Sequence, residues 1–343
     1  MRNDTLAIYD VSPFVYIGNY IRGNYQDKLY GFPVKGVYYL LKYLSYDLAK
    51  NKDIVLCFDS RSFRKDIYKS YKEHRIPNPE VFAQLDFLYE YLTKCGFVCL
   101  KENGYEADDL IYNVVQKQKH KYNEILIYGV DYDLAHNVSS NVKFQSISSQ
   151  VLSIDTRNFS QALVKGETIV FNTITAYKVF TGDKSDKVKP FRTKDYTGYQ
   201  LYNLFIDTIT KAMPDVSPDI IRTKETLQVF INVLKPHLTE EEHKQLTQRL
   251  DIFYPAEIDK DIFDWTCHRY NINIKLYVEL LSTLRDNKSL KSLGERNSGF
   301  SEKIKEDLLN RGRKLITGEY AVDKNIVEGC VRMTSESLII KEF

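Results

Sequence analysis

Residues 125–133 read Ile-Leu-Ile-Tyr-Gly-Val-Asp-Tyr-Asp, a short apolar run that ends at two carboxylates. A continuous apolar run of this length, followed by glycine, is typical of a strand buried on both faces of a parallel sheet. The same pattern occurs at residues 6–10, which end at Asp10, and at residues 54–59, which end at Asp59. A fourth apolar run lies at residues 97–100. These four runs predict the strands of one sheet.

Segments with helical spacing of apolar residues lie between these runs, at residues 35–50, 81–93 and 107–119. Buried strands that alternate with helices of this length indicate βαβ units. We therefore predict an α/β fold over residues 1–180, with a parallel-rich central sheet and flanking helices.

Beyond about residue 168 the strand pattern gives way to helical patterns, at residues 168–180, 200–212, 224–234, 240–253 and 274–284. We predict a mainly helical C-terminal region over residues 181–284. Residues 285–313 are rich in Ser, Asn, Lys and Gly, so residues 285–343 are predicted to form a tail or accessory segment.

The composition is that of a globular protein, with 43% hydrophobic and 27% charged residues, and it excludes a disordered or fibrous chain. No apolar run approaches the ~18 residues of a membrane span, and the first ten residues do not resemble a signal peptide. We therefore expect a soluble, cytoplasmic protein. The five cysteines form no Cys-x-x-Cys pair and the six histidines are dispersed, so a zinc site is not expected.

Nine acidic residues lie where the predicted sheet would gather them. Three predicted strands end in acids, three more acids open the helix after Tyr105, and two follow Gly182 at i and i+3 spacing. Ligands of open parallel sheets bind at the carboxyl ends of the strands, so we expect these side chains to converge. The nine are Asp10, Asp59, Glu106, Asp108, Asp109, Asp131, Asp133, Asp183 and Asp186.

Each acidic motif also has a structural explanation. An Asp after a strand caps the next helix, acids in a first helical turn complement the helix dipole, and the motif after Gly182 is compatible with an ordinary surface turn. Convergence of all nine would produce severe repulsion, so that at least some of them would have to be protonated or bound to hard divalent cations. Without these nine charges the formal net charge of +2 becomes +11, the pattern of an acidic pocket in a basic body that binds a polyanion.

A basic stretch follows Asp59 directly. Residues 61–75 contain six basic and two acidic side chains. Intervals of four, three, four and three residues separate Arg61, Lys65, Tyr68, Lys72 and Arg75, so a helix here would have one cationic face that also contains an aromatic ring. A second basic cluster follows Asp183, at residues 184–194. A solvated surface helix would also explain the first stretch, but its position beside the acids favours phosphate contacts.

The motifs together resemble a known family. Phe58-Asp59, Tyr71-Lys72-x-x-Arg75, Glu106-x-Asp108-Asp109, Asp131-x-Asp133 and Gly182-Asp183-x-x-Asp186 occur in the order seen in the flap endonuclease / 5′-3′ exonuclease family. Within it the chain is most similar to the T-even phage RNase H members. The resemblance covers residues 6–195 and implies a PIN/5′-nuclease-like fold, with a basic helical arch at about residues 61–95 and DNA binding by the helical region.

The resemblance also implies an activity: magnesium-dependent 5′-3′ exonuclease and flap endonuclease cleavage, with RNase H-type removal of RNA primers during DNA replication. Two magnesium ions, for which manganese can substitute, would be held by the nine acids. Asp10, Asp59, Asp108 and Asp131 would favour one ion; Glu106, Asp133, Asp183 and Asp186 would favour the other, with Asp109 in support.

In the same reading Lys72 and Arg75 would be catalytic, orienting the scissile phosphate, and Tyr71 would stack on a terminal base. The remaining nucleic-acid-binding candidates are basic side chains of the two clusters: Arg61, Arg64, Lys65, Lys69, Lys184, Lys187, Lys189, Arg192 and Lys194. The implied partners are DNA with 5′ flaps, nicks or forks and RNA–DNA hybrids, with a sliding clamp or single-strand-binding protein as a further candidate. No membrane partner is expected; the protein would act as a monomer in the cytoplasm, that of a bacterial host if phage-encoded.

Two features depart from the family pattern, and rival functions remain. Tyr132 lies between the paired acids where a small residue is usual, and residues 187–197 lack the glycines of a helix-hairpin-helix. A Toprim-type enzyme would need a Glu where this chain has Asp10, and a PIN-type ribonuclease is typically shorter. A non-catalytic DNA-binding replication accessory protein is the non-enzymatic alternative.

Overall fold

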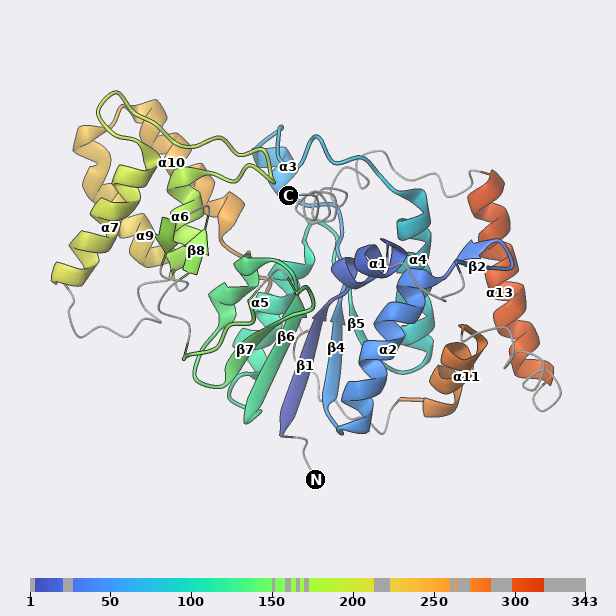
Figure 1. The fold of residues 1–343 in the computed structure, drawn as a ribbon. Helices are drawn as coiled ribbons and strands as arrows, with labels where there is room; N and C mark the ends of the chain where they lie inside the picture. Colours follow the sequence, from blue (N-terminus) through green and yellow to red (C-terminus); the bar gives the residue numbers. More distant parts are fainter. Residues whose placement is uncertain are drawn as a thin grey trace.

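The computed structural model describes residues 4–20, 27–149, 152–157, 162–164, 167–169, 173–212, 223–259, 263, 272–284 and 298–317. A five-stranded parallel sheet lies at its centre (Figure 1). The strand order is β5-β4-β1-β6-β7, with β1 in the middle. The strands are β1 (Thr5–Asp10), β4 (Asp53–Cys57), β5 (Val98–Leu100), β6 (Glu124–Gly129) and β7 (Val142–Ser146). The predicted parallel sheet is confirmed.

Helices cover both faces of the sheet, as the predicted α/β class requires. The side chains of β1 alternate between the two faces, so that Ala7 and Tyr9 enter one apolar core while Leu6 and Ile8 enter the other. The first core is covered by α1 (Val11–Tyr20), α2 (Lys35–Ala49) and α4 (Pro79–Lys94), and the second by α5 (Ala107–Gln118) and the short helix η1 (Tyr132–Asn137).

A helical unit with its own apolar core follows the sheet in sequence. It consists of α6 (Ile174–Thr181), α7 (Gly198–Ala212), α9 (Lys224–Leu234), η3 (Lys235–His237) and α10 (Glu240–Phe253). The helix predicted over residues 168–180 is shorter than expected, because residues 167–169 form β9 (Glu167–Ile169), which pairs with β8 (Ala162–Val164). Since α6 packs with the later helices, the helical unit begins a few residues before the predicted boundary at 180/181.

Two C-terminal helices pack on the α/β unit. Helix α11 (Ile274–Leu284) contributes Tyr277 and Leu280 to the core beneath α2 and α4, so it does not belong to the helical unit as predicted. Helix α13 (Ser298–Thr317) packs on α4 and on the hairpin of β2 (Lys28–Leu29) and β3 (Phe32–Pro33). Of the two alternatives for residues 285–343, a tail or an accessory segment, the packing of α13 favours the accessory segment, and the rest of that segment lies outside the described residues.

In the described part of the chain, no helix has both the length and the apolar character that a membrane crossing requires.

Candidate metal centre

Three strand ends bring the first acids together. Asp10 ends β1, and Asp59 and Asp131 lie two residues beyond the ends of the neighbouring strands β4 and β6. Adjacent strands are about 4.8 Å apart, so the backbone alone places these three acids at one edge. Gly129 leaves the space beside them: an added Cβ would lie 2.4 Å from Leu134 Cδ1 and 3.7 Å from Asp10 Oδ2.

The start of α5 adds three further acids to this edge. Glu106 is the N-cap residue, and its side chain forms a capping box with Asp109. The backbone N–H of Ala107 donates to Asp59 Oδ1 at 2.9 Å, which fixes the helix start against the end of β4. Asp108 accepts from the Asp109 N–H at 2.8 Å. Burial, and then the neighbouring Asp109 carboxylate, raise the pKa of Asp108 well above its usual range.

Asp10 lies at the centre of the first group of carboxylates. Its side chain is buried, and its Oδ1 atom has no hydrogen-bond partner among the described residues. Burial, followed by repulsion from Asp59, Asp108 and Asp131, raises the pKa of Asp10 well above its usual range. A buried carboxylate with an unsatisfied oxygen and three like-charged neighbours is chemically suited to a divalent cation with oxygen ligands. The residues of this group therefore fit a metal ion.

The second group of predicted ligands is already paired with protein cations. Lys72 Nζ lies 2.5 Å from Glu106 Oε1, and Arg75 Nη2 lies 2.5 Å from Asp186 Oδ1. Burial opposes the ionisation of Glu106, but Lys72 and Arg64 lower its pKa to about 2. Burial raises the pKa of Asp186 even though Lys72 and Arg75 oppose that shift.

Lys178, on α6, pairs with the other two acids of this group. Its Nζ atom lies 2.6 Å from both Asp133 Oδ2 and Asp183 Oδ2, and 3.9 Å from Asp131 Oδ1. Burial opposes ionisation of Asp183, yet Lys178 and Ser185 hold its pKa well below the usual range. Burial and the Asp131 carboxylate raise the pKa of Asp133 to about 7 despite Lys178.

No group of three or more Asp, Glu, His or Cys side chains in the described residues is arranged to hold a metal ion. In the first group the acids face one another without a cation between them, which suits their chemistry to an added ion, whereas Lys72, Arg75 and Lys178 lie among the acids of the second group. The second group as placed does not fit a further divalent cation.

Two predicted site residues form an ion pair with each other in the structure. Asp109, predicted to support the metal ligands, is fully buried and forms a bidentate ion pair with Arg64 at 2.7 Å for both contacts. Arg64, predicted to bind nucleic acid, is 1% exposed and cannot reach a ligand from outside. The nucleic-acid role predicted for Arg64 is corrected, whereas Asp109 keeps a supporting position, since it accepts from the Glu106 backbone N–H and supplies the counter-charge that buried Arg64 needs.

The segment 61–75 is not one helix, so the predicted cationic face does not form. Helix α3 (Arg64–Ile67) has a single turn, after which Tyr68 is extended and Lys72 has a left-handed φ of 52°. Arg61 and Lys69 are exposed, Arg61 in an ion pair with Asp66, and Lys65 is half-buried, so all three side chains are in contact with solvent. Tyr71 is buried and donates to Glu106 Oε2 at 2.9 Å, which excludes base stacking in this arrangement.

The second basic cluster lies on a loop. Residues 182–197 connect α6 to α7 and contain two tight turns, closed by bridges between Asp183 and Val188 and between Arg192 and Thr197. Its five basic side chains are all exposed: Lys184, Lys187, Lys189, Arg192 and Lys194.

Sequence reasoning missed three polar partners of the acids. Ser12 Oγ donates to Asp59 Oδ2 at 2.5 Å, and Ser62 Oγ donates to Glu106 Oε2 at 3.2 Å. Lys178 is the third, and the available signal was a single lysine inside the otherwise apolar helix Ile-Thr-Ala-Tyr-Lys-Val-Phe-Thr.

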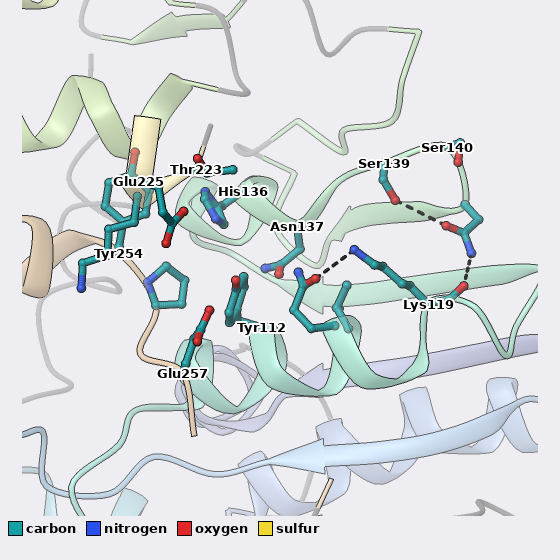
Figure 2. A pocket seen from close by; sticks show the side chains of 15 residues that line it. Tyr112, Lys119, His136, Asn137, Ser139, Ser140, Thr223, Glu225, Tyr254 and Glu257 are labelled. Carbon is teal, nitrogen blue, oxygen red and sulfur yellow. Dashed lines mark hydrogen bonds between the residues drawn. The ribbon is translucent and has the colours of Figure 1, made fainter. Parts of the chain in front are cut away.

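A cavity of about 550 Å³ lies farther along α5, between the α/β unit and the helical unit (Figure 2). Tyr112, His136 and Tyr254 line it together with Glu225 and Glu257. None of the nine predicted ligands is among the residues that line it, so this cavity is separate from the acidic site.

Comparison with known proteins gives one family match. Residues 5–165 match the model described as "5′-3′ exonuclease, N-terminal resolvase-like domain". The chain is 33% identical over 122 residues to a 5′-3′ exonuclease of Buchnera aphidicola subsp. Schizaphis graminum, which covers 34% of this chain and 42% of that protein. It is 30% identical over 190 residues to a 5′-3′ exonuclease of Aquifex aeolicus, which covers 54% of this chain and 63% of that protein.

The matched segments thus span less than two thirds of either relative. Among solved structures, the T5 D15 protein co-crystallised with metal ions superposes with a TM-score of 0.49 at 14% identity, covering 90% of this chain and 99% of that one.

Proposed function

We propose that this chain, whose residues 5–165 fall in the 5′-3′ exonuclease N-terminal resolvase-like family, is a metal-dependent 5′-nuclease that hydrolyses phosphodiester bonds. The observation that carries the proposal is the Asp10 carboxylate. It is buried, has an unsatisfied oxygen and is surrounded by three further acids at the carboxyl edge of a parallel sheet.

Asp10, Asp59, Asp108 and Asp131 would hold the ion. Bound there, magnesium or manganese would supply a Lewis acid for the phosphoryl oxygens and would lower the pKa of water. The sequence predicted a second magnesium, for which Glu106, Asp133, Asp183 and Asp186 are the candidate ligands. That second position would require the cations paired with these acids to move.

Lys72 and Arg75 would orient the scissile phosphate by exchanging carboxylate partners for phosphate oxygens. Both contact an acid of the site through a terminal nitrogen, and Arg75 can present two N–H groups to one phosphate. The exposed basic residues Arg61, Lys69, Lys184, Lys187, Lys189, Arg192 and Lys194, with half-buried Lys65, would contact the backbone of the nucleic acid.

The finer expectations belong to the same proposal. The substrates would be DNA with 5′ flaps, nicks or forks and RNA–DNA hybrids, with primer removal during replication as the biological role. Kinship to the T-even phage RNase H, a monomeric state, cytoplasmic location and contacts with a sliding clamp or single-strand-binding protein follow from the sequence resemblance alone.

The test is digestion of 5′-labelled flap, nicked and RNA–DNA hybrid substrates by the purified chain, with magnesium or with EDTA. We expect cleavage from the 5′ end in magnesium only, and none by the Asp10→Asn variant in either condition. Tight substrate binding without cleavage by the wild type would instead favour the non-catalytic DNA-binding protein.

A further inference from the structure

Lys178 occupies the space between the acids of the second group. Its side chain is only 16% exposed, and its Nζ atom contacts Asp133 and Asp183 at the same distance of 2.6 Å. Asp131 Oδ1, from the first group, is 3.9 Å away. An ammonium group has three donors and a compact charge, so Lys178 serves these carboxylates as a bound cation would.

The backbone holds this lysine in place. Helix α6 ends at Thr181, and the next residue, Gly182, has a φ of 74° that turns the chain so that Asp183 lies back against the last turn of the helix. A Cβ on Gly182 would lie 2.4 Å from Val188 O, so the turn requires glycine. Lys178 and Asp183 are therefore brought together by one turn, and Asp133 approaches from η1.

We propose that Lys178 is a positioning residue that limits the metal content of the site to one divalent ion, because its ammonium takes the place of the second. This inference rests on the proposed function, since it presupposes a first ion at the Asp10 group. A second divalent ion could bind only where Lys178 has left Asp133 and Asp183, since like charges would otherwise share the same oxygens.

Replacement of Lys178 by an uncharged residue should then increase the number of ions bound. Asp133 would gain most, because its Oδ1 atom already lacks a hydrogen-bond partner among the described residues. Lys178→Met keeps an unbranched apolar stem, Lys178→Gln keeps a hydrogen-bond donor without the charge, and Lys178→Arg keeps the charge.

The experiment is a titration of the metal-free full chain with manganese, without DNA, in which free Mn²⁺ is measured by electron paramagnetic resonance. We expect about one tightly bound ion in the wild type and about two in Lys178→Met and Lys178→Gln. Lys178→Arg should remain at about one. The matched control is Lys117→Met, an exposed lysine of α5 that should also bind about one ion.

Folding is monitored in parallel by thermal unfolding with and without manganese, since unpaired acids destabilise a metal-free variant. Manganese should raise the melting temperature of Lys178→Gln more than that of the wild type. Two tightly bound ions in the wild type, or unchanged stoichiometry in both uncharged variants, would overturn the inference and leave the proposed function intact. A wild type that binds no manganese would overturn both.

Discussion

At the scale of single residues, Arg64 shows how one buried charge organises the site. All five N–H donors of its guanidinium are used: two go to Asp109 at 2.7 Å, one to Glu106 at 3.2 Å, and two to the carbonyls of Ile252 and Tyr254. The two carbonyls lie at the C-terminal end of α10, where a cation is favoured. Arg64 thus joins the acids of the candidate metal centre to the helical unit.

Removal of the Arg64 guanidinium should destabilise the fold. Arg64→Met leaves Asp109 buried without its partner, and we expect the free energy of unfolding to fall by about 3–5 kcal/mol. The control is Arg61→Met, which removes an ion pair with Asp66 that is about half exposed, and it should cost less than ~1 kcal/mol. Urea denaturation measures both. Equally small decreases in the free energy of unfolding for both variants would contradict the role of Arg64 in joining the acidic site to the helical unit.

The raised pKa of Asp133 gives a second prediction, on pH. Its carboxyl binds a proton more tightly in the folded state, with a pKa of about 7 against 3.8 for the ordinary group. The charged form therefore destabilises the metal-free fold, and this penalty is absent below about pH 4, grows as the pH rises towards 7 and is constant above it. The Asp133→Asn variant should lack this penalty, because its side chain does not ionise.

We accordingly expect Asp133→Asn to melt at a higher temperature than the wild type in EDTA at pH 8, and the difference to shrink towards zero near pH 4. The gain should be about 1–2 kcal/mol, less than the full shift suggests, because the side chain is 27% exposed. Thermal unfolding over a pH series measures the difference. A gain that is constant with pH would show that Asp133 is not the group responsible.

At the scale of elements, the strands that end in acids and the helices α2, α4 and α5 were predictable because their apolar spacing is regular. Strand β7 was missed because Val-Lys-Phe-Gln-Ser, at the sheet edge, carries polar residues on its half-buried positions. Helix α13 was missed because Ser, Asn and Gly near its start suggested a loop, whereas packing against α4 decides its structure.

The part of the site that lies at the strand ends was also predictable from the sequence, because it depends on the same regular strand pattern. Strand order places Asp10, Asp59 and Asp131 together, so their convergence follows from a backbone pattern that the sequence displays. The partners of the second group come from tertiary contacts between distant segments, such as Lys178 with Asp133 and Arg64 with Asp109. The spacing of residues within a segment carries no information on such contacts. The sequence predicted one exposed helix over residues 61–75, and that prediction placed Arg64 on its surface, whereas the structure buries it.

The loop between α6 and α7 leads to a third prediction. Lys187 is exposed and has a left-handed φ of 56°, a conformation that costs a non-glycine residue about 1 kcal/mol. Lys187→Gly should therefore stabilise the fold by up to about 1 kcal/mol, whereas Lys187→Ala keeps the strain. If the side-chain charge binds phosphate, both variants should weaken duplex binding equally.

Binding isotherms over a salt series test that contact. Each lost phosphate contact should reduce the slope of log affinity against log salt by about 0.9, stepwise for Lys187, Lys189 and Arg192 replaced by Ala. Potassium and sodium should give equal affinities, because residues 187–197 contain no glycine to bring backbone amides close to a phosphate. A clear potassium preference would show that the loop binds through its backbone.

At the scale of the whole molecule, charge is divided between an acidic site and a basic remainder. The net charge is +2, and it is +11 without the nine acids. Four protein cations, Arg64, Lys72, Arg75 and Lys178, already lie among those acids, so the repulsion that a polyanion would meet at the site is smaller than the sequence suggested. The acids that repel DNA most strongly are those without a close cation.

This division gives a fourth prediction. The double variant Asp131→Ala, Asp133→Ala should lose detectable cleavage because two of the proposed ligands are gone. Its DNA affinity in EDTA should be equal to or higher than that of the wild type, since two negative charges have been removed. Electrophoretic binding and cleavage assays on one flap substrate measure both. Wild-type cleavage by this variant would exclude the proposed site.

The position of β1 in the middle of the sheet has a consequence for how such a protein can change. Main-chain pairing with β4 and β6 on either side fixes the spacing of three acids, and this pairing involves no residue of the helical unit. The helices of that unit have a separate apolar core, but they also meet the site, through Lys178 on α6 and through the carbonyls that accept from Arg64 at the end of α10, so an exchange of the unit would leave only the strand-end register unchanged. The three strand-end acids are thus the part of the site that such an exchange would leave in place, whereas the acids paired with Lys178 would need a matching cation from the incoming helices.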